Sequence, residues 1–123
     1  DIVLINLGSN DFSTLVKPTP KQYTDAYLRM IDNIRSHYGN VPVLCVTPHS
    51  ASRYLQTALD YLRERLMNKY SDVYMANPMP GIVTEAADTG SDYHPNYQGQ
   101  CKIAMSLIPQ ISAITKWNLT DLF

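Results

Sequence analysis

The sequence has no long apolar run, little net charge and few cysteines, and each of these absences excludes a class of protein. No run of apolar residues approaches the roughly 20 that a membrane-spanning helix needs. The formal net charge of −1 gives no reason to expect nucleic acid or an anionic membrane surface as a partner. The two cysteines fit no zinc or redox spacing. The sequence therefore predicts no metal site, no cofactor, and no membrane or nucleic-acid partner.

What remains is the composition of an ordinary globular protein. The chain has 123 residues, about one domain, of which 45% are hydrophobic and 17% charged. Cys45 lies in an apolar strand pattern and Cys101 in an early helix turn, so both thiols are expected to be buried. The chain opens on 1–5, which has the pattern of a strand interior, and this abrupt start suggests a piece of a longer protein.

Apolar runs predict three strands, at residues 2–7, 41–46 and 72–76. The first has the pattern of a strand buried on both faces of a parallel sheet. Strands that alternate with helices indicate parallel βαβ units with right-handed crossovers. We therefore expect an α/β fold with three α/β/α layers, of the flavodoxin-like kind. Three strands make a small sheet for such a domain, so the N-terminal strands are expected to be missing and to lie before Asp1.

Three segments have strong helix signals. Thr19 and Gln22 form a capping box at the start of the first helix, and Gly39 supplies its stop. The second helix is expected from about 52 to 70 and the third from about 96 to 116. The apolar residues at helical spacing, expected to face the core, are Tyr23, Tyr27, Ile31, Ile34, Leu55, Leu59, Leu62, Leu66, Ile103, Leu107, Ile111 and Ile114.

A long irregular segment, residues 77–95, precedes the third helix. Loops of this length are uncommon in compact domains and are often functional. Asn96 is a good N-cap residue, which places His94 on a stiff loop just before a helix N-terminus. The positive end of the helix dipole disfavours imidazolium and would keep the ring neutral, as a general base requires. The alternative is a loop histidine that merely precedes a helix cap.

Polar loops follow the first two strands, at Gly8–Asp11 and Thr47–Ser50. In an open parallel sheet, ligands bind outside the carboxyl ends of the strands. We therefore expect Asn10 and His94 to lie at one edge of the sheet. The Asn10 amide is a donor suited to an oxyanion that develops during acyl transfer. The alternative is a turn residue bonded to its own backbone.

These residues resemble two sequence blocks of the SGNH (GDSL-type) hydrolases. Leu7–Asp11 is similar to their Gly-x-Asn-Asp block, and Asp92–Asn96 is similar to the final block, which carries the catalytic histidine. The longer strings Ile5–Ser13 and Gly90–Asn96 also resemble carbohydrate esterase family two, which removes acetyl groups from polysaccharides such as xylan. The resemblance implies that residues 1–123 are the C-terminal portion of a single hydrolase domain.

The resemblance also implies roles for individual residues. Asn10 matches the asparagine that helps to form the oxyanion hole, and Gly8 matches the glycine that permits the turn beside the substrate. His94 matches the base that activates a serine and later protonates the leaving sugar hydroxyl. The Gly-Asp-Ser block that carries the nucleophile is absent from the sequence. We therefore expect the serine upstream of Asp1 and no hydrolysis by this chain alone.

The sequence departs from the superfamily at the acid that orients the base. The superfamily places an aspartate three residues before the histidine, where this chain has Ser91, and Asp92 lies two residues before His94. Either Asp92 or a backbone carbonyl is therefore expected to orient the ring. Tyr93 could form an aromatic wall for a sugar ring or simply pack the loop. His49 could line a sugar subsite or be an exposed turn histidine.

Two functions of different classes follow from these expectations. The first is a secreted serine esterase that acts on acetylated polysaccharide or another small acyl ester. The second is a non-catalytic carbohydrate-binding module on the same scaffold. A serine in a Gly-Asp-Ser context upstream of Asp1 would favour the esterase. The sequence does not indicate an oligomeric state.

Overall fold

Three short parallel strands form the middle layer of the computed structural model, which describes residues 1–122. The strands are β1 (Val3–Ile5), β2 (Val43–Cys45) and β3 (Val73–Met75), and they lie side by side in the order β1-β2-β3. Both pairs are parallel, and the first residue of each strand is in register with the first residue of its neighbour. The structure therefore confirms the predicted parallel α/β sheet.

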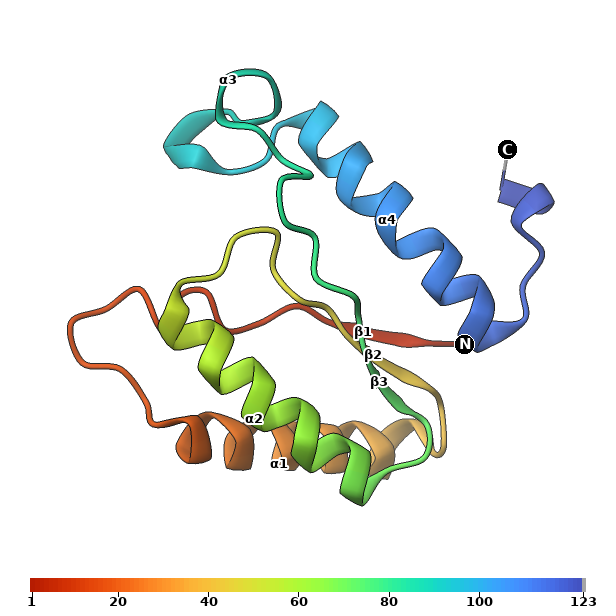
Figure 1. The fold of residues 1–123 in the computed structure, drawn as a ribbon. Coiled ribbons are helices and arrows are strands. Elements are labelled where there is room, and N and C mark those ends of the chain that lie inside the picture. The colour runs from red at the N-terminus through yellow and green to blue at the C-terminus, as the bar shows by residue number, and fades with distance from the viewer. Residues whose placement is uncertain (123) are drawn as a thin grey trace.

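Helices cover both faces of this sheet, as Figure 1 shows. Helices α1 (Pro20–Tyr38) and α2 (Arg53–Lys69) pack side by side on one face. Helix α4 (Tyr97–Thr115) lies on the other face. The result is the expected three-layer α/β/α arrangement. Among residues 1–122, no helix is long and apolar enough to cross a bilayer.

The helices begin where the capping residues of the sequence predict. Thr19 Oγ1 accepts a hydrogen bond from the Gln22 amide at 3.1 Å, and Gln22 Oε1 accepts one from the Thr19 amide at 2.9 Å, which completes the capping box. Gly39 ends α1 with a φ of 71°, a value that favours glycine. Ser52 caps α2 through a 3.2 Å bond from the Leu55 amide.

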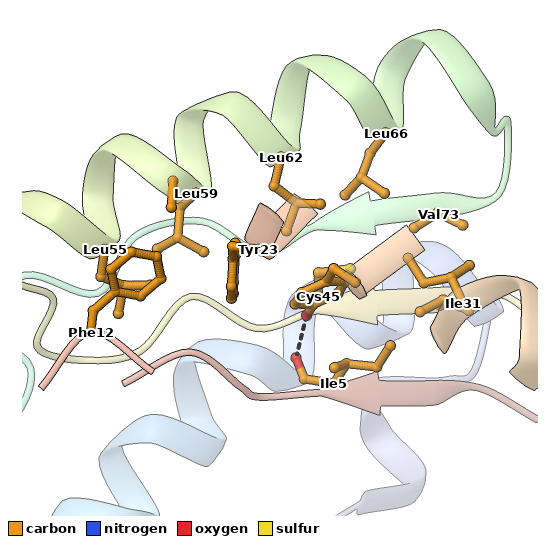
Figure 2. Close-up of a cluster of buried hydrophobic side chains, with 13 residues drawn as sticks. Ile5, Phe12, Tyr23, Ile31, Cys45, Leu55, Leu59, Leu62, Leu66 and Val73 are labelled. Atoms are coloured by element: carbon orange, nitrogen blue, oxygen red, sulfur yellow. Dashed lines mark hydrogen bonds between the residues drawn. The ribbon is translucent and has the colours of Figure 1, made fainter. Parts of the chain in front are cut away.

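The larger core lies between the sheet and the two helices α1 and α2, and Figure 2 shows it. Both helices contribute the apolar faces that their spacing predicts. Tyr27 Oη donates a 3.4 Å hydrogen bond to the Ile5 carbonyl, so its one polar atom is paired inside the core. The buried members of this core are Ile5, Phe12, Tyr23, Tyr27, Ile31, Val43, Cys45, Leu55, Ala58, Leu59, Leu62, Leu66 and Val73.

The second core, beneath α4, is smaller. Of the four α4 residues predicted to face the sheet, Leu107 is buried, while Ile103, Ile111 and Ile114 are only partly buried. The other buried members come from the sheet and from the segment that follows it: Leu44, Val46, Ala76 and Met79.

Two burial predictions are wrong. The first strand is not buried on both faces, because Leu4 is 43% exposed and Leu7 is 50% exposed. Leu4 belongs to the edge strand β1 and lies outside the core beneath α4, whereas its central-strand partner Leu44 is buried there. Cys101 is exposed on α4, although Cys45 is buried as expected. An apolar pattern indicates a strand or a helix but not its position in the layers.

The segment between β3 and α4 is more ordered than the sequence predicts. It contains the single-turn helix α3 (Glu85–Asp88) and the 3-10 turn η1 (Ser91–Tyr93). A further 3-10 turn, η2 (Leu119–Leu122), follows α4. The turns α3 and η1 position His94, as described next.

Candidate active site

The loops that follow the three strands leave the sheet at the same edge, toward the left of the view in Figure 1. Asn10 follows β1, His49 follows β2 and His94 lies in the segment after β3. Parallel strands require this arrangement, because all their carboxyl ends point the same way. Residues far apart in the sequence are thereby brought to one edge.

The loop that carries Asn10 (residues 8–13) is anchored by aromatic side chains. Gly8 has a φ of 127°, and a Cβ added there would lie 2.7 Å from Tyr23 Oη and 3.0 Å from Leu55 Cδ1. Tyr23 Oη donates a 2.9 Å hydrogen bond to the Leu7 carbonyl. Phe12 is buried, and its ring meets that of Tyr23 edge-on with centroids 5.3 Å apart. We call Phe12 and Tyr23 the aromatic anchor.

The Asn10 side chain is not used to build its own loop. Its backbone carbonyl accepts hydrogen bonds from Ser13, at 3.3 Å from the amide and 3.0 Å from the hydroxyl. Within residues 1–122 the exposed side-chain amide of Asn10 forms no hydrogen bond with another residue. The geometry thus differs from that of a turn asparagine bonded to its own backbone, and leaves the amide able to donate to a ligand.

The loop that carries His94 (residues 89–95) is closed by backbone contacts. Thr89 and Pro95 form an antiparallel bridge. Inside it, the Gly90 amide donates to the His94 carbonyl at 2.8 Å, and the His94 amide donates to the Ser91 carbonyl at 3.2 Å. These bonds hold the backbone of His94 on both sides.

A backbone carbonyl, rather than a carboxylate, contacts the His94 ring. Nδ1 lies 3.3 Å from the Ser91 carbonyl oxygen. A carbonyl can only accept, so this contact favours the tautomer with the proton on Nδ1 and the lone pair on Nε2. No hydrogen bond or ion pair between Asp92 and His94 occurs in the part of the chain that the structure describes. The ring is exposed, with Nε2 suited to accept a proton.

Two successive residues before His94 have left-handed backbone. Asp92 has a φ of 57° and Tyr93 a φ of 59°. Aspartate tolerates this region, but for tyrosine it costs roughly 1–2 kcal/mol. Such backbone strain concentrates at functional sites. The turn brings the Ser91 carbonyl back to the His94 ring and leaves the Tyr93 side chain 73% exposed.

Tyr93 and the partly buried His49 line one pocket of about 310 Å³ at this edge. A volume near 300 Å³ is at the lower limit of small-molecule sites. Both residues were candidates for sugar contact, and the structure brings them together. Neither Asn10 nor His94 lines this pocket. The residues that line it are His49, Ser50, Gly81, Val83, Thr89 and Tyr93.

Asp88 has a structural role in this region that its sequence context does not predict: Asp88, Asp92 and His94 suggest at most a metal site, and their spacing matches no established one. Its side chain is fully buried at the end of α3. Oδ2 accepts hydrogen bonds from the Thr84 amide at 2.9 Å, from Thr84 Oγ1 at 3.0 Å and from Lys102 Nζ at 2.7 Å. The Lys102 hydrogen bond, followed by that of the Thr84 amide, holds the pKa of the Asp88 carboxyl below its usual value. The only signal in the sequence is an isolated acid in a loop.

Asn96 joins the two ends of the same loop. Its Oδ1 accepts from the Gly99 amide at 3.0 Å, which confirms it as the N-cap of α4. Its Nδ2 donates to the Ala87 carbonyl at 3.0 Å and to the Thr89 carbonyl at 3.4 Å. Its backbone amide donates to the Asp88 carbonyl at 2.7 Å. We call Asp88, Asn96 and Lys102 the polar anchor.

No group of three or more His, Cys, Asp or Glu side chains that could hold a metal ion is found among the described residues. Asp88 lies near His94 in the sequence, but its carboxylate is engaged by Lys102 and Thr84.

The chain is similar to a curated esterase, although no protein-family model matches it. It is 25% identical over 122 residues to the cellulase/esterase CelE of Acetivibrio thermocellus, a match that covers 94% of this chain and 14% of the relative. The fold is that of family two carbohydrate esterases. The enzyme from Corynascus thermopiles (Myceliophthora fergusii), solved with a carbohydrate-binding domain, superposes with a TM-score of 0.79 at 26% identity.

An esterase of the same family from Clostridium thermocellum, solved in complex with cellohexaose, superposes with a TM-score of 0.80 at 24% identity. An active-site mutant of a family two esterase from that organism superposes with a TM-score of 0.78 at 25% identity. Each match covers 95% of this chain, whereas the chain spans 36 to 38% of these solved structures. The resemblance that the sequence motifs indicated is confirmed: in fold and in sequence the chain is similar to the family two carbohydrate esterases.

Proposed function

We propose that this chain supplies the base and an oxyanion donor of a serine esterase that removes acetyl groups from polysaccharide. The observation that supports the proposal is that an amide donor and an oriented imidazole, both exposed, lie at the same edge of the sheet. The Asn10 amide is not used by its own loop, and the His94 ring is held through Nδ1. The similarity to carbohydrate esterases supports the substrate class.

In this proposal His94 acts as general base and then as general acid. Nε2 removes the proton from a serine hydroxyl as its oxygen attacks the acetyl carbonyl. The tetrahedral intermediate then collapses, and the same proton passes to the leaving sugar oxygen. A water molecule, activated by His94 in the same way, releases acetate from the acyl-serine. The Ser91 carbonyl holds the ring through both steps.

Asn10 stabilises the charge that this attack creates. Its Nδ2 donates to the oxygen that becomes negative in the tetrahedral intermediate. Gly8 keeps the preceding turn tight, because any larger residue would strike Tyr23. The pocket lined by Tyr93 and His49 is proposed to hold the sugar from which the acetyl group is removed. In this proposal the Ser91 carbonyl, rather than Asp92, orients His94.

The nucleophile of the proposed reaction is not in this chain. We propose that residues 1–123 are the C-terminal portion of a single hydrolase domain whose serine comes from another segment, and that the complete protein is secreted. A histidine and an oxyanion donor need an attacking group. The chain alone should therefore hydrolyse an aryl acetate no faster than background. Turnover that a serine-directed phosphonate abolishes would contradict this assignment.

The roles of His94 and Asn10 are tested in the complete protein. Loss of one oxyanion donor costs about 10²- to 10³-fold in kcat, so Asn10→Ala should lower kcat by about a hundredfold with little change in KM. His94→Ala should cost at least as much. His37→Ala and Asn68→Ala, on exposed helix surfaces, are the matched controls and should leave kcat unchanged. If Asn10→Ala changes only KM, Asn10 binds the substrate but does not stabilise the oxyanion.

A second function, glycan binding without catalysis, is favoured by one observation. The pocket with Tyr93 excludes His94, and a family two esterase was solved in complex with cellohexaose. In that case cellohexaose should shift the NMR signals of Tyr93 and His49, and the complete protein should hydrolyse no acetyl ester. If the complete protein hydrolyses an acetyl ester and His94→Ala abolishes this activity, the esterase function is correct and the non-catalytic one is wrong.

A further inference from the structure

Asp88 is the only charged side chain that is fully buried among the residues whose burial the structure describes. Burying a carboxylate is costly unless hydrogen bonds and an opposite charge compensate it. Here three donors, from Thr84 and Lys102, meet Oδ2, while Oδ1 has no partner among the described residues. The carboxylate is therefore held on one side only, and Lys102 is the one countercharge paired with it in the part of the chain that the structure describes.

This ion pair links the two elements on either side of the His94 loop. Asp88 is the last residue of α3, directly before the loop, and Lys102 lies on α4, directly after it. The Asp88 carbonyl also accepts the 2.7 Å bond from the Asn96 amide. One residue thus joins α3 to α4 through both its backbone and its side chain.

A glycine allows this close approach. A Cβ at Gly99 would lie 2.4 Å from the Asp88 carbonyl oxygen and 3.1 Å from the Pro95 Cβ. The end of α3 therefore rests directly on the backbone of the first turn of α4. Since backbone meets backbone here, a change in the spacing of α3 and α4 must also move the two ends of the His94 loop.

Among the described residues, the centre of the His94 loop has no buried side chain to replace this contact, and Pro95 at its end is only partly buried. The turn η1 contains no buried residue, and Tyr93 and His94 are exposed. Its order depends on directional hydrogen bonds and on the ion pair. Such interactions fix a geometry more sharply than they add stability.

We propose that Asp88 and Lys102 are positioning residues for His94: their ion pair sets the spacing of α3 and α4 and thereby places the ring against the serine and the acyl group. This inference rests on the proposed role of His94 as the base. Neither residue touches the substrate. Because misplacement of a reacting group by about 1 Å can cost about a hundredfold in rate, the pair should act on kcat rather than on KM.

Lys102→Met tests the pair, with Lys102→Arg as the conservative variant. In the complete protein, Lys102→Met should lower kcat by about tenfold to a hundredfold, with KM changed less than about threefold. Lys102→Arg restores the countercharge and should recover kcat. Lys69→Met is the matched control, since it breaks the 2.8 Å Lys69–Asp32 bridge at the end of α2 and should leave kcat unchanged.

Hydrogen exchange on the chain itself gives a readout that does not depend on catalysis. In Lys102→Met the amides of Gly90 and Asn96 should lose at least about tenfold in protection. The amides of Val46 and Ala76, which bond across the sheet, should keep theirs. An equal loss at all four amides would indicate a general loss of stability and would contradict a positioning role.

A double variant covers the case in which Lys102→Met does not fold. Asp88→Asn/Lys102→Met removes both charges, so that no unpaired carboxylate is left in the interior. This variant should fold and keep the kcat defect, and a return to wild-type kcat would overturn the proposal.

The two proposals fail in different ways. If His94→Ala leaves ester hydrolysis intact, the role of His94 is wrong, and the exchange data still report whether the pair holds the loop. If His94→Ala abolishes hydrolysis while Lys102→Met changes neither kcat nor exchange, the positioning role alone is wrong.

Discussion

The Asn10 loop and the His94 loop leave the same edge of the sheet, yet different forces hold them. The aromatic anchor, Phe12 and Tyr23, ties the Asn10 loop to the large core of α1 and α2. The His94 loop directly precedes α4, the helix that covers the smaller core, and is held by the polar anchor of Asp88, Asn96 and Lys102.

The difference shows that one fold can hold two loops by interactions that differ in how strongly they depend on direction. Apolar burial is non-directional, so the Asn10 loop is stable without depending on any single angle. Hydrogen bonds and ion pairs depend on direction and on charge, so the His94 loop is sharply placed but sensitive to sterics and to pH. The proposed base depends on this directional placement, because its Nε2 must come within hydrogen-bond reach of the serine hydroxyl.

The largest expected effect comes from removing the aromatic anchor. Phe12→Ala empties a buried site and should lower the free energy of unfolding by about 3–5 kcal/mol, as measured by chemical denaturation. Phe12→Leu keeps most of the apolar volume and should cost less than about 1.5 kcal/mol. A small loss for Phe12→Ala, at the level of the leucine variant, would show that the Asn10 loop is held by something other than the aromatic anchor.

A smaller effect is expected at the polar anchor from Gly99→Ala. The new methyl group overlaps the Asp88 carbonyl, an overpacking that costs about 1–3 kcal/mol, while alanine regains about 1 kcal/mol of helix propensity. The net loss, up to about 2 kcal/mol, should be concentrated in the exchange of the Gly90 and Asn96 amides. Gln100→Ala, on the exposed next position, is the control. A stabilised Gly99→Ala with unchanged loop exchange would rule out the tight contact.

Acid should distinguish the two loops. A carboxyl whose pKa is lowered by folding stabilises the native state above its ordinary pKa, and this contribution is lost as the pH falls below that value. The Asp88 pKa is lowered from 3.8. Exchange protection in the His94 loop should therefore fall below about pH 4, while the Phe12 amide of the Asn10 loop keeps its protection. Asp88→Asn should remove this pH dependence, and equal losses in both loops would contradict the comparison.

The smallest effect is expected for Asp92→Asn. Since the Ser91 carbonyl contacts Nδ1 of His94, Asp92 is not needed to orient the ring. Asp92→Asn in the complete protein should lower kcat less than about tenfold, far below the loss for His94→Ala. A loss as large as that of His94→Ala would make Asp92 the orienting acid.

Local signals in the sequence predicted most of the fold. The capping box at Thr19, the stop at Gly39 and the cap at Asn96 each act within a few residues, so a single sequence contains all the information they need. The same holds for the apolar spacing of α1 and α2. The parallel direction of the strands and their shared edge follow from the βαβ rule, whereas the strand order was not predicted.

The sequence could not predict features that depend on position in the layers. Leu4 and Cys101 have apolar patterns, yet both are exposed in the structure. Asp88 is the reverse case, a charged residue buried because Lys102 and Thr84 reach it from elsewhere in the chain. The orientation of His94 depends on the left-handed turn at Asp92 and Tyr93, a conformation that no propensity favours for tyrosine.

The side chain of Asn96 limits which sequences can encode the His94 loop. By helix-cap preference alone Asn96 is replaceable, because serine and aspartate cap helices about as well. In this structure, however, its oxygen caps α4 while its nitrogen donates to the carbonyls of Ala87 and Thr89. Aspartate would cap the helix but has no hydrogen to donate, and serine is too short to serve both sides. Helix-cap preference would allow several residues at this position, but of these only asparagine makes both sets of hydrogen bonds.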